Sequence, residues 1–217
     1  AGFMEPADEV GGDYYDVLQY DGHVKIGIGD VTGHGLESGM LMLMTQTAVR
    51  TLLISEERNP ARFLNILNRT IYDNVQRMEA DKSLSLALLD YDGHGHVRLS
   101  GQHEELIVVR QGGKVELIDT INLGFPVGLD DDIADFVNER LIKLQAGDGV
   151  VLYTDGITEA ENLSGEQYGL ERMCDILSRH WQQSADGIKQ ALIDDLHQYI
   201  GQQTVFDDIT LLVLKQK

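Results

Sequence analysis

Residues 23–35 read HVKIGIGDVTGHG and combine a strand pattern with an acidic turn. Apolar side chains alternate along the stretch as far as Ile28, which predicts a β-strand. The strand ends in Gly29-Asp30, and the glycines that follow let the backbone turn or approach a ligand closely before a helix. We therefore expect Asp30 to be held rigidly at a strand end.

The residues before this strand are expected to form its hairpin partner. Residues 10–20 and 23–31 predict two antiparallel strands, and Asp21-Gly22 supplies the turn between them. Such a pairing would bring Asp13 and Asp30 toward the same end of the hairpin.

Four short segments of the chain carry aspartate at the end of an apolar, strand-like run. Oxygen ligands from remote parts of a chain suit Mg²⁺ or Mn²⁺, and two such ions about 3.5 to 4 Å apart can activate a water against a phosphoryl group. The pattern therefore predicts metal-dependent hydrolysis of a phosphate ester. A turn or N-cap role is the alternative for each aspartate taken singly, whereas the set favours a metal site. The segments are Gly11-Gly12-Asp13, Gly29-Asp30-Val31-Thr32-Gly33-His34-Gly35, Thr154-Asp155-Gly156 and Asp207-Asp208-Ile209-Thr210.

The rest of the chain shows helical and strand patterns without repeats, low-complexity tracts or linkers. We expect helices at 36–54 and 60–78, packed together, and an irregular stretch at 118–132. One α+β domain spanning residues 1–217, with helices on the outside, is the simplest reading. The inward side of the second helix should carry Phe63, Ile66, Leu67 and Ile71. Further strands are expected at 84–91, 97–100, 106–110, 114–117, 136–144, 150–153 and 209–214, and further helices at 169–180 and 185–200.

Composition limits the classes of function. The chain has 217 residues, of which 42% are hydrophobic, so it can bury a sizeable core. Its net charge of −19 disfavours binding to nucleic acid or to an anionic membrane. The single cysteine, Cys174, rules out an internal disulfide, and no apolar run is long enough for a membrane span, so a cytoplasmic protein is expected.

As a set, these motifs resemble the SpoIIE/RsbU-type bacterial branch of the type 2C metal-dependent serine/threonine phosphatases. The resemblance covers nearly the whole chain and is highly specific. The residues that carry it are Glu9–Asp16, Gly29–Gly35, Leu123–Gly128, Leu152–Ala160 and Phe206–Leu212.

This resemblance implies an αββα sandwich of two mostly antiparallel sheets with two Mn²⁺ or Mg²⁺ ions. Asp30 would contact both ions, Asp155 and Asp207 would complete one, and Asp13 with the backbone carbonyl of Val31 would hold the other. Asp30, Asp155 and Asp207 would be the catalytic residues, and a metal-activated water would attack phosphorus directly. Asp208 would be a neighbour of the site, not a ligand.

The resemblance also implies a substrate and a setting. The substrate would be phosphoserine or phosphothreonine on a small protein partner, an anti-sigma factor antagonist. The chain begins without an initiator Met, so we expect a C-terminal piece of a longer regulatory protein, with a receiver domain of the response-regulator type or a sensor domain upstream. Whether the domain acts as a monomer or as a homodimer stays open.

Two rival functions remain. The same fold could serve as a non-catalytic adaptor that binds a partner, although such a module has no need of four ligand-type aspartates. A two-metal phosphoesterase for nucleotides or nucleic acid is disfavoured by the acidic charge.

Several histidines suggest weaker alternatives. His34 could be a general acid, but a turn-stabilising role is favoured. His94, His96 and His103 could suggest zinc, but residues 92–96 are better interpreted as an exposed hairpin turn. The role of the loop at 100–105, where the family pattern is not matched, is undetermined.

Overall fold

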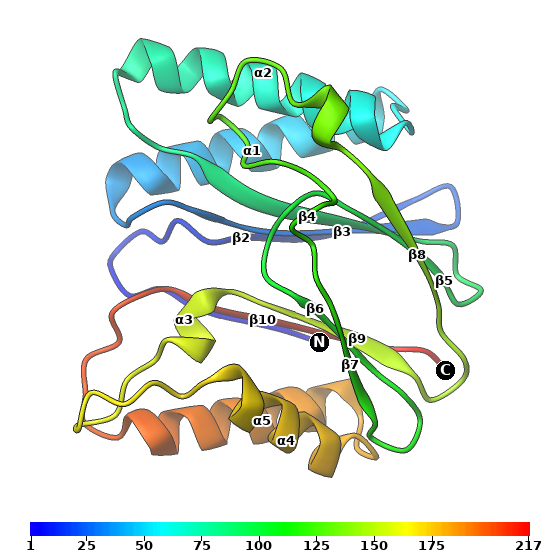
Figure 1. The fold of residues 1–217 in the computed structure, drawn as a ribbon, viewed down its shortest axis with the longest axis vertical. Helices are drawn as coiled ribbons and strands as arrows, with labels where there is room; N and C mark the ends of the chain where they lie inside the picture. Colours follow the sequence, from blue (N-terminus) through cyan, green and yellow to red (C-terminus); the bar gives the residue numbers. More distant parts are fainter. The chain divides into compact units, whose positions relative to one another are not determined.

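Two five-stranded sheets organise the chain, and each belongs to its own unit (Figure 1). The structure, a computed structural model, describes residues 1–217. The first unit comprises Ala1–Glu9, Glu104–Asp119 and Leu144–Lys217, and the second comprises Val10–His103 and Thr120–Lys143. Each unit is described below by itself.

The second unit places two helices on one face of its sheet. The strand order is β2-β3-β4-β5-β8, and every neighbouring pair is antiparallel. Helices α1 (Leu36–Ile54) and α2 (Pro60–Met78) cover one face, with a short 3-10 turn, η1 (Ala134–Phe136), beside α2 (Figure 1). The strands are β2 (Tyr14–Tyr20), β3 (His23–Val31), β4 (Leu84–Tyr91), β5 (His96–Ser100) and β8 (Glu139–Lys143).

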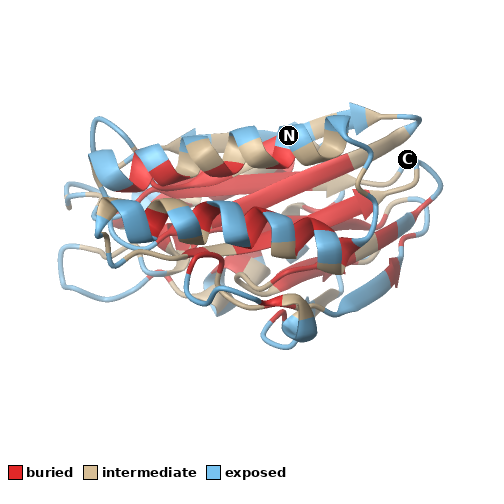
Figure 2. Ribbon diagram, turned by 90° about the horizontal axis from the view of Figure 1, so that it is seen from above, coloured by how far each residue is buried: buried red, intermediate tan, exposed pale blue.

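Helix α2 shows how local sequence fixes an element. Asn59 precedes it and its side-chain oxygen accepts from the amide of Arg62 at 2.9 Å, while Pro60 occupies the first turn, where a missing N–H costs little. Figure 2 shows both helices of this unit with pale outer faces and buried residues toward the red strands. The predicted inward residues are buried except Ile66, which is 41% exposed. That part of the prediction was wrong, because the buried stripe runs instead through Phe63, Leu64, Leu67 and Ile71.

The first unit consists of a five-stranded sheet and the helices that pack on it. Its strand order is β1-β10-β9-β6-β7, again antiparallel throughout. Its helical segments are α3 (Asp155–Thr158), α4 (Leu170–His180) and α5 (Ala185–Ile200), and the last two carry the apolar residues that pack on the sheet. The strands are β1 (Gly2–Glu5), β6 (Leu106–Val109), β7 (Val115–Ile118), β9 (Gly149–Tyr153) and β10 (Ile209–Lys215).

Most predicted elements are present within one or two residues of their expected bounds. The helices predicted at 36–54, 60–78 and 185–200 agree with the structure at both ends. Two short elements, β1 and α3, were not predicted. The strand expected at 136–144 is shorter, because residues 134–136 form η1 and only Glu139–Lys143 pairs with β5.

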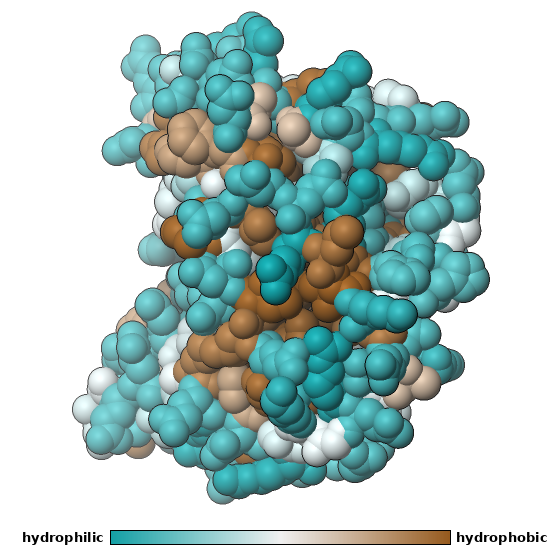
Figure 3. All heavy atoms as spheres, turned by 45° about the vertical axis from the view of Figure 1, so that its right-hand side comes forward, coloured by the Kyte–Doolittle hydropathy of each residue, from teal (hydrophilic) through white to brown (hydrophobic).

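The surface is mainly polar. The face drawn in Figure 3 is largely hydrophilic, and hydrophobic atoms reach it as patches among polar ones. Some large apolar side chains, such as Ile54 and Leu141, are exposed, as is normal for folded proteins. None of the helices combines the length and the apolar character needed to cross a membrane.

Candidate metal centre

The hairpin of the second unit brings the first two aspartates to one end. In the β2–β3 register Tyr14 lies opposite Gly29, so one further step along each strand sets Asp13 against Asp30. Asp13 is only 3% exposed, which is unusual for a carboxylate without a structural or functional partner. The prediction that these two residues share one end of the hairpin is confirmed.

The backbone carbonyl of Val31 lies against the same segment. A methyl group placed on Gly12 would be 3.1 Å from the Val31 carbonyl oxygen and 3.3 Å from that of Gly33. A side chain at residue 12 would therefore require these neighbours to shift by a few tenths of an ångström. Asp13, Asp30 and Val31 thus lie on neighbouring segments at one end of the β2–β3 hairpin.

The turn after Asp30 depends on glycine as predicted. Gly33 and Gly35 have φ of 71° and 88°, in the left-handed region that other residues rarely adopt. Helix α1 begins directly afterwards, and the Ser38 hydroxyl in its first turn donates to the Gly33 carbonyl at 2.9 Å. The turn is thereby tied to the helix that follows it.

One histidine lies close to this end, and the sequence had suggested it only as a disfavoured zinc ligand. Ser85 on β4 is the cross-strand partner of Asp30, and its hydroxyl is 2.7 Å from Nδ1 of His103. His103 belongs to the loop at 100–105. The β4–β5 pairing brings them together, because Leu88 lies opposite Ser100 and the Leu86 amide donates to the Gln102 carbonyl at 2.7 Å.

The first unit gathers the other two aspartates at the end of β9 and the start of β10. Leu211 pairs with Tyr153, and the Thr154 amide donates to the Thr210 carbonyl at 3.1 Å. A methyl group on Gly156 would lie 2.0 Å from the Asp208 carbonyl oxygen and 3.3 Å from that of Asp207. Asp155, the first residue of α3, therefore lies beside the Asp207 segment.

Burial and nearby like charges both act on Asp155. Burial raises the pKa of Asp155, and the negative charges of Asp207 and Glu159 raise it further. A cation would offset this repulsion. Asp208 is a separate case, because it is 3% exposed and accepts from the Ala7 amide at 2.8 Å. This agrees with its expected place as a neighbour of the site.

Two glutamates that were not predicted as site residues add to the negative charge near Asp155. Glu159 follows Asp155 by one helical turn, and burial together with the charges of Asp155, Glu105 and Glu159 raises the pKa of Glu104. A cavity of about 190 Å³ lies next to Asp207 and is lined in part by Glu159, Glu161 and Phe206. Glu159 could have been found from its position in the motif around Asp155.

The structure thus contains two acidic pairs, one in each unit: Asp13 with Asp30, and Asp155 with Asp207. The structure contains no group of three or more His, Cys, Asp or Glu side chains that could hold a metal ion. His94 and His96 lie at a hairpin turn, where their backbone amides donate to Asp92 at 2.7 and 3.0 Å. The turn interpretation of that segment is confirmed.

Comparison with known protein families gives a clear match. The family model of Stage II sporulation protein E (SpoIIE) matches residues 20–217. The phosphoserine phosphatase RsbU of Bacillus subtilis (strain 168) is 28% identical over 216 residues. The alignment covers 98% of this chain and 61% of RsbU, so the chain spans only part of the length of that relative.

Solved structures share the fold over the full chain. The SiaA-PP2C domain of Pseudomonas aeruginosa superposes with a TM-score of 0.84 at 22% identity, covering 100% of this chain and 86% of that one. RsbX in complex with magnesium gives a TM-score of 0.69 at 12% identity, covering 98% of this chain and 92% of RsbX. At such identities the likeness concerns the fold alone. It confirms the predicted class of two antiparallel sheets flanked by helices.

Proposed function

The chain belongs to the SpoIIE family, as its motifs predicted, and from this membership we propose that it is a metal-dependent protein serine/threonine phosphatase, a phosphoric monoester hydrolase. The observation that carries the proposal is the presence of two acidic pairs, each held at a strand end by a neighbouring glycine. The similarity to RsbU, a phosphoserine phosphatase, supports the same reaction.

The donor set fits hard divalent cations, Mn²⁺ or Mg²⁺. All five proposed ligands offer oxygen, which is the ligand type that these ions prefer. Four carboxylates carry about −4 and two ions about +4, so the loaded site would be close to neutral. In our proposal Asp155 and Asp207 would hold one ion, Asp13 with the Val31 carbonyl would hold the other, and Asp30 would be shared between them.

The protein's own residues would hold the ions and fix their geometry relative to the phosphoryl group. When bound, the ions would supply Lewis-acid stabilisation of phosphoryl charge and a water made more acidic. The glycines beside the aspartates would let backbone and ligands approach closely, and the carboxylates at strand ends would keep a fixed geometry. Asp30, Asp155 and Asp207 would be the residues on which turnover depends most.

The proposed substrate is phosphoserine or phosphothreonine on a small protein, an anti-sigma factor antagonist. The name of RsbU supports phosphoserine, and the charge of −19 argues against nucleic acid. We propose that the domain works in the cytoplasm, in agreement with the free thiol of Cys174, and under the control of an upstream receiver or sensor domain.

Replacing Asp30 tests the reaction directly. We expect Asp30→Ala to reduce Mn²⁺-dependent phosphate release from an aryl phosphate and from a phosphoserine protein by on the order of 100-fold or more, since even outer-shell partners of metal ligands are worth 10- to 100-fold. Asp131→Ala, which removes the same charge from an exposed loop, is the matched control and should retain activity. Hydrolysis that survives Asp30→Ala would remove Asp30 from the mechanism. No hydrolysis by the unmodified protein would favour the adaptor function.

A further inference from the structure

Lys82 lies on the segment between α2 and β4 and reaches the turn that follows Asp30 and Val31. Its ammonium nitrogen is 2.8 Å from the Thr32 carbonyl oxygen and 3.0 Å from the Ser38 hydroxyl. Ser38 is fully buried, and its hydroxyl donates in turn to the Gly33 carbonyl at 2.9 Å. One lysine therefore holds two successive carbonyl groups of the turn, the first directly and the second through Ser38.

Ser83, the next residue, holds the same turn by two further hydrogen bonds. The Thr32 amide donates to the Ser83 carbonyl at 2.9 Å, and the Ser83 amide donates to the Thr32 hydroxyl at 3.1 Å. Residues 82 and 83 thus engage the amide, the carbonyl and the side chain of Thr32. Such a set of contacts leaves the Thr32 backbone little freedom to rotate.

The orientation of Thr32 determines the orientation of the Val31 carbonyl. The Val31 C=O and the Thr32 N–H belong to one planar peptide unit, and the chain contains no cis peptide, so these two groups point in opposite directions. Since the N–H is directed to Ser83, the C=O is directed away from it. The approach of 3.1 Å between Val31 O and the position of a methyl group on Gly12 agrees with this direction.

The ammonium fits this place sterically and electrostatically. A methyl group on Gly33 would come within 3.2 Å of the Lys82 nitrogen, so the glycine leaves room for the cation. Carbonyl and hydroxyl oxygens are suitable acceptors for its N–H groups, of which it has three. A methionine at this position would keep the length of the side chain and lose every donor.

We propose that Lys82 is a positioning residue for the turn at Thr32 and Gly33. By holding this turn, it would fix the orientation of the Val31 carbonyl, one of the proposed metal ligands. This inference rests on the proposed function, since it concerns the same site. Lys82 itself contacts neither substrate nor ion in this role.

The test compares three variants by calorimetric Mn²⁺ titration and by amide hydrogen exchange of the metal-free protein. Lys82→Met should weaken Mn²⁺ binding about 10-fold, in the range found for outer-shell partners of metal ligands, and should speed exchange of the Thr32 amide. Lys82→Arg, which keeps a cation, should restore part of both. Lys215→Met is the matched control, because Lys215 also donates to two backbone carbonyls, those of Trp181 and Gln183 at 2.6 and 2.8 Å, but at the end of β10 remote from Asp207. It should leave the Mn²⁺ affinity unchanged.

Each outcome separates this inference from the proposed function. If Lys82→Met binds Mn²⁺ as tightly as the unmodified protein, the positioning role is overturned, while the two-metal phosphatase proposal stands. A raised KM for the phosphoprotein with unchanged Mn²⁺ affinity would likewise overturn it in favour of direct substrate contact. An unmodified protein that binds no Mn²⁺ overturns both.

Discussion

Gly156 occupies a position in the first unit where the backbone leaves no room for a side chain. A methyl group there would lie 2.0 Å from the Asp208 carbonyl oxygen, far inside van der Waals contact, and a carbonyl of the main chain cannot rotate away as a side chain can. The glycine is therefore required by the close packing of two acidic segments, and its φ plays no part. This explains why Gly follows Asp155 directly.

Gly156→Ala should destabilise the protein through this clash. We expect a loss of about 1 to 3 kcal/mol, as for other overpacked sites, and each kcal/mol corresponds to about 2 to 4 °C in melting temperature for a chain of this size. Gly112→Ala is the matched control, because nothing lies within 4 Å of the added methyl group. Its thermal unfolding should match or slightly exceed that of the unmodified protein. Equal melting temperatures for both variants would contradict the packing argument.

Candidate site residues could be predicted where a local sequence pattern distinguishes them. The aspartates at 13, 30, 155 and 207 were found because each ends an apolar run beside a glycine or a second aspartate. Lys82 was not, since its contacts with Thr32 and Ser38 arise from tertiary structure and follow no local pattern. Sequence reasoning therefore identified the candidate ligands and missed the residues around them.

At the scale of elements, the long helices were predictable because periodicity and end signals agree. Helix α2 has a capping Asn59, a Pro60 in its first turn and a regular apolar stripe. The same stripe includes Asn68, which is fully buried and bonds the Gly128 amide at 2.8 Å and the Asp130 carbonyl at 2.9 Å. Asn68 thereby holds the irregular stretch after β7 in place. A buried polar residue of this kind cannot be predicted from the sequence pattern.

Short elements were missed for a related reason. Strand β1 and helix α3 contain four residues each, too few to show a period. Strand β1 exists because it pairs with β10, more than 200 residues later in the chain. Such long-range pairing overrides local preference and is invisible to a window of neighbouring residues.

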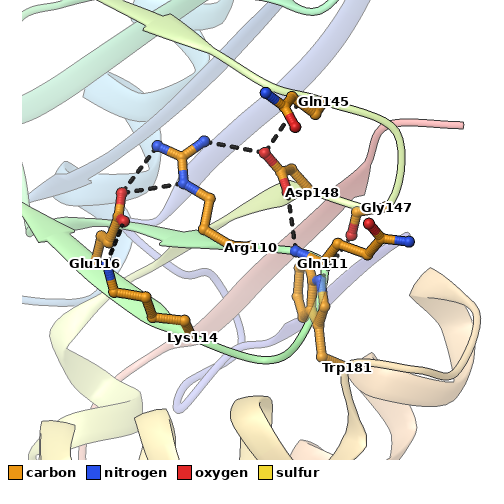
Figure 4. A network of polar contacts seen from close by, with 8 residues as sticks. All are labelled: Arg110, Gln111, Lys114, Glu116, Gln145, Gly147, Asp148 and Trp181. Carbon is orange, nitrogen blue, oxygen red and sulfur yellow. Dashed lines mark hydrogen bonds and ion pairs between the residues drawn. The ribbon is translucent and has the colours of Figure 1, made fainter.

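The β6–β7 hairpin is fastened to the start of β9 by a charged network (Figure 4). Arg110 donates to Glu116 at 2.8 Å and to Asp148 at 3.0 Å. Asp148, which is 4% exposed, also accepts from the amides of Gln111 and Gln145 at 2.9 and 3.0 Å. Burial by itself would raise the pKa of Asp148, but these amides and the guanidinium outweigh it, so the pKa is lowered.

Asp148→Asn should therefore cost stability in a pH-dependent way. We expect a loss of about 1.5 to 3 kcal/mol near pH 7, as for hydrogen bonds to a charged group. Because the folded-state pKa lies below the unfolded value of about 3.9, the contribution of the carboxylate is complete above that value and disappears as the pH falls through the folded pKa. Urea unfolding of both proteins at pH 7 and below pH 4 measures the difference. If the difference in unfolding free energy between the two proteins does not change with pH, the lowered pKa of Asp148 would be contradicted.

At the scale of the whole molecule, the net charge is −19, and the two acidic pairs contribute four of the carboxylates. With 36 acidic residues against 17 basic ones, few cations of the protein are left to neutralise them. Divalent ions are therefore the natural counter-charge at the candidate site. This links the metal proposal to the stability of the chain as well as to its chemistry.

Removing metal should lower the melting temperature, and Mn²⁺ or Mg²⁺ should restore it. At a free ion concentration of 100 times Kd, binding to the folded state is worth about 2.7 kcal/mol, which is about 5 to 10 °C here. Differential scanning calorimetry with chelator and with added Mn²⁺ measures the shift. Asp30→Ala should show a much smaller response. If the melting temperature is the same with and without excess chelator, this result would count against a site made of Asp13, Asp30, Asp155 and Asp207.

The pairing of β1 with β10 has a consequence for how the polypeptide matures. Strand β10 lies between β1 and β9 in the sheet, yet it is synthesised after both of them. The sheet of the first unit cannot be completed before β10 has been synthesised, whereas all strands of the other sheet have been synthesised by residue 143. Contacts this distant in sequence make folding slow, and the nascent β1 and β9 keep unsatisfied edges during that delay.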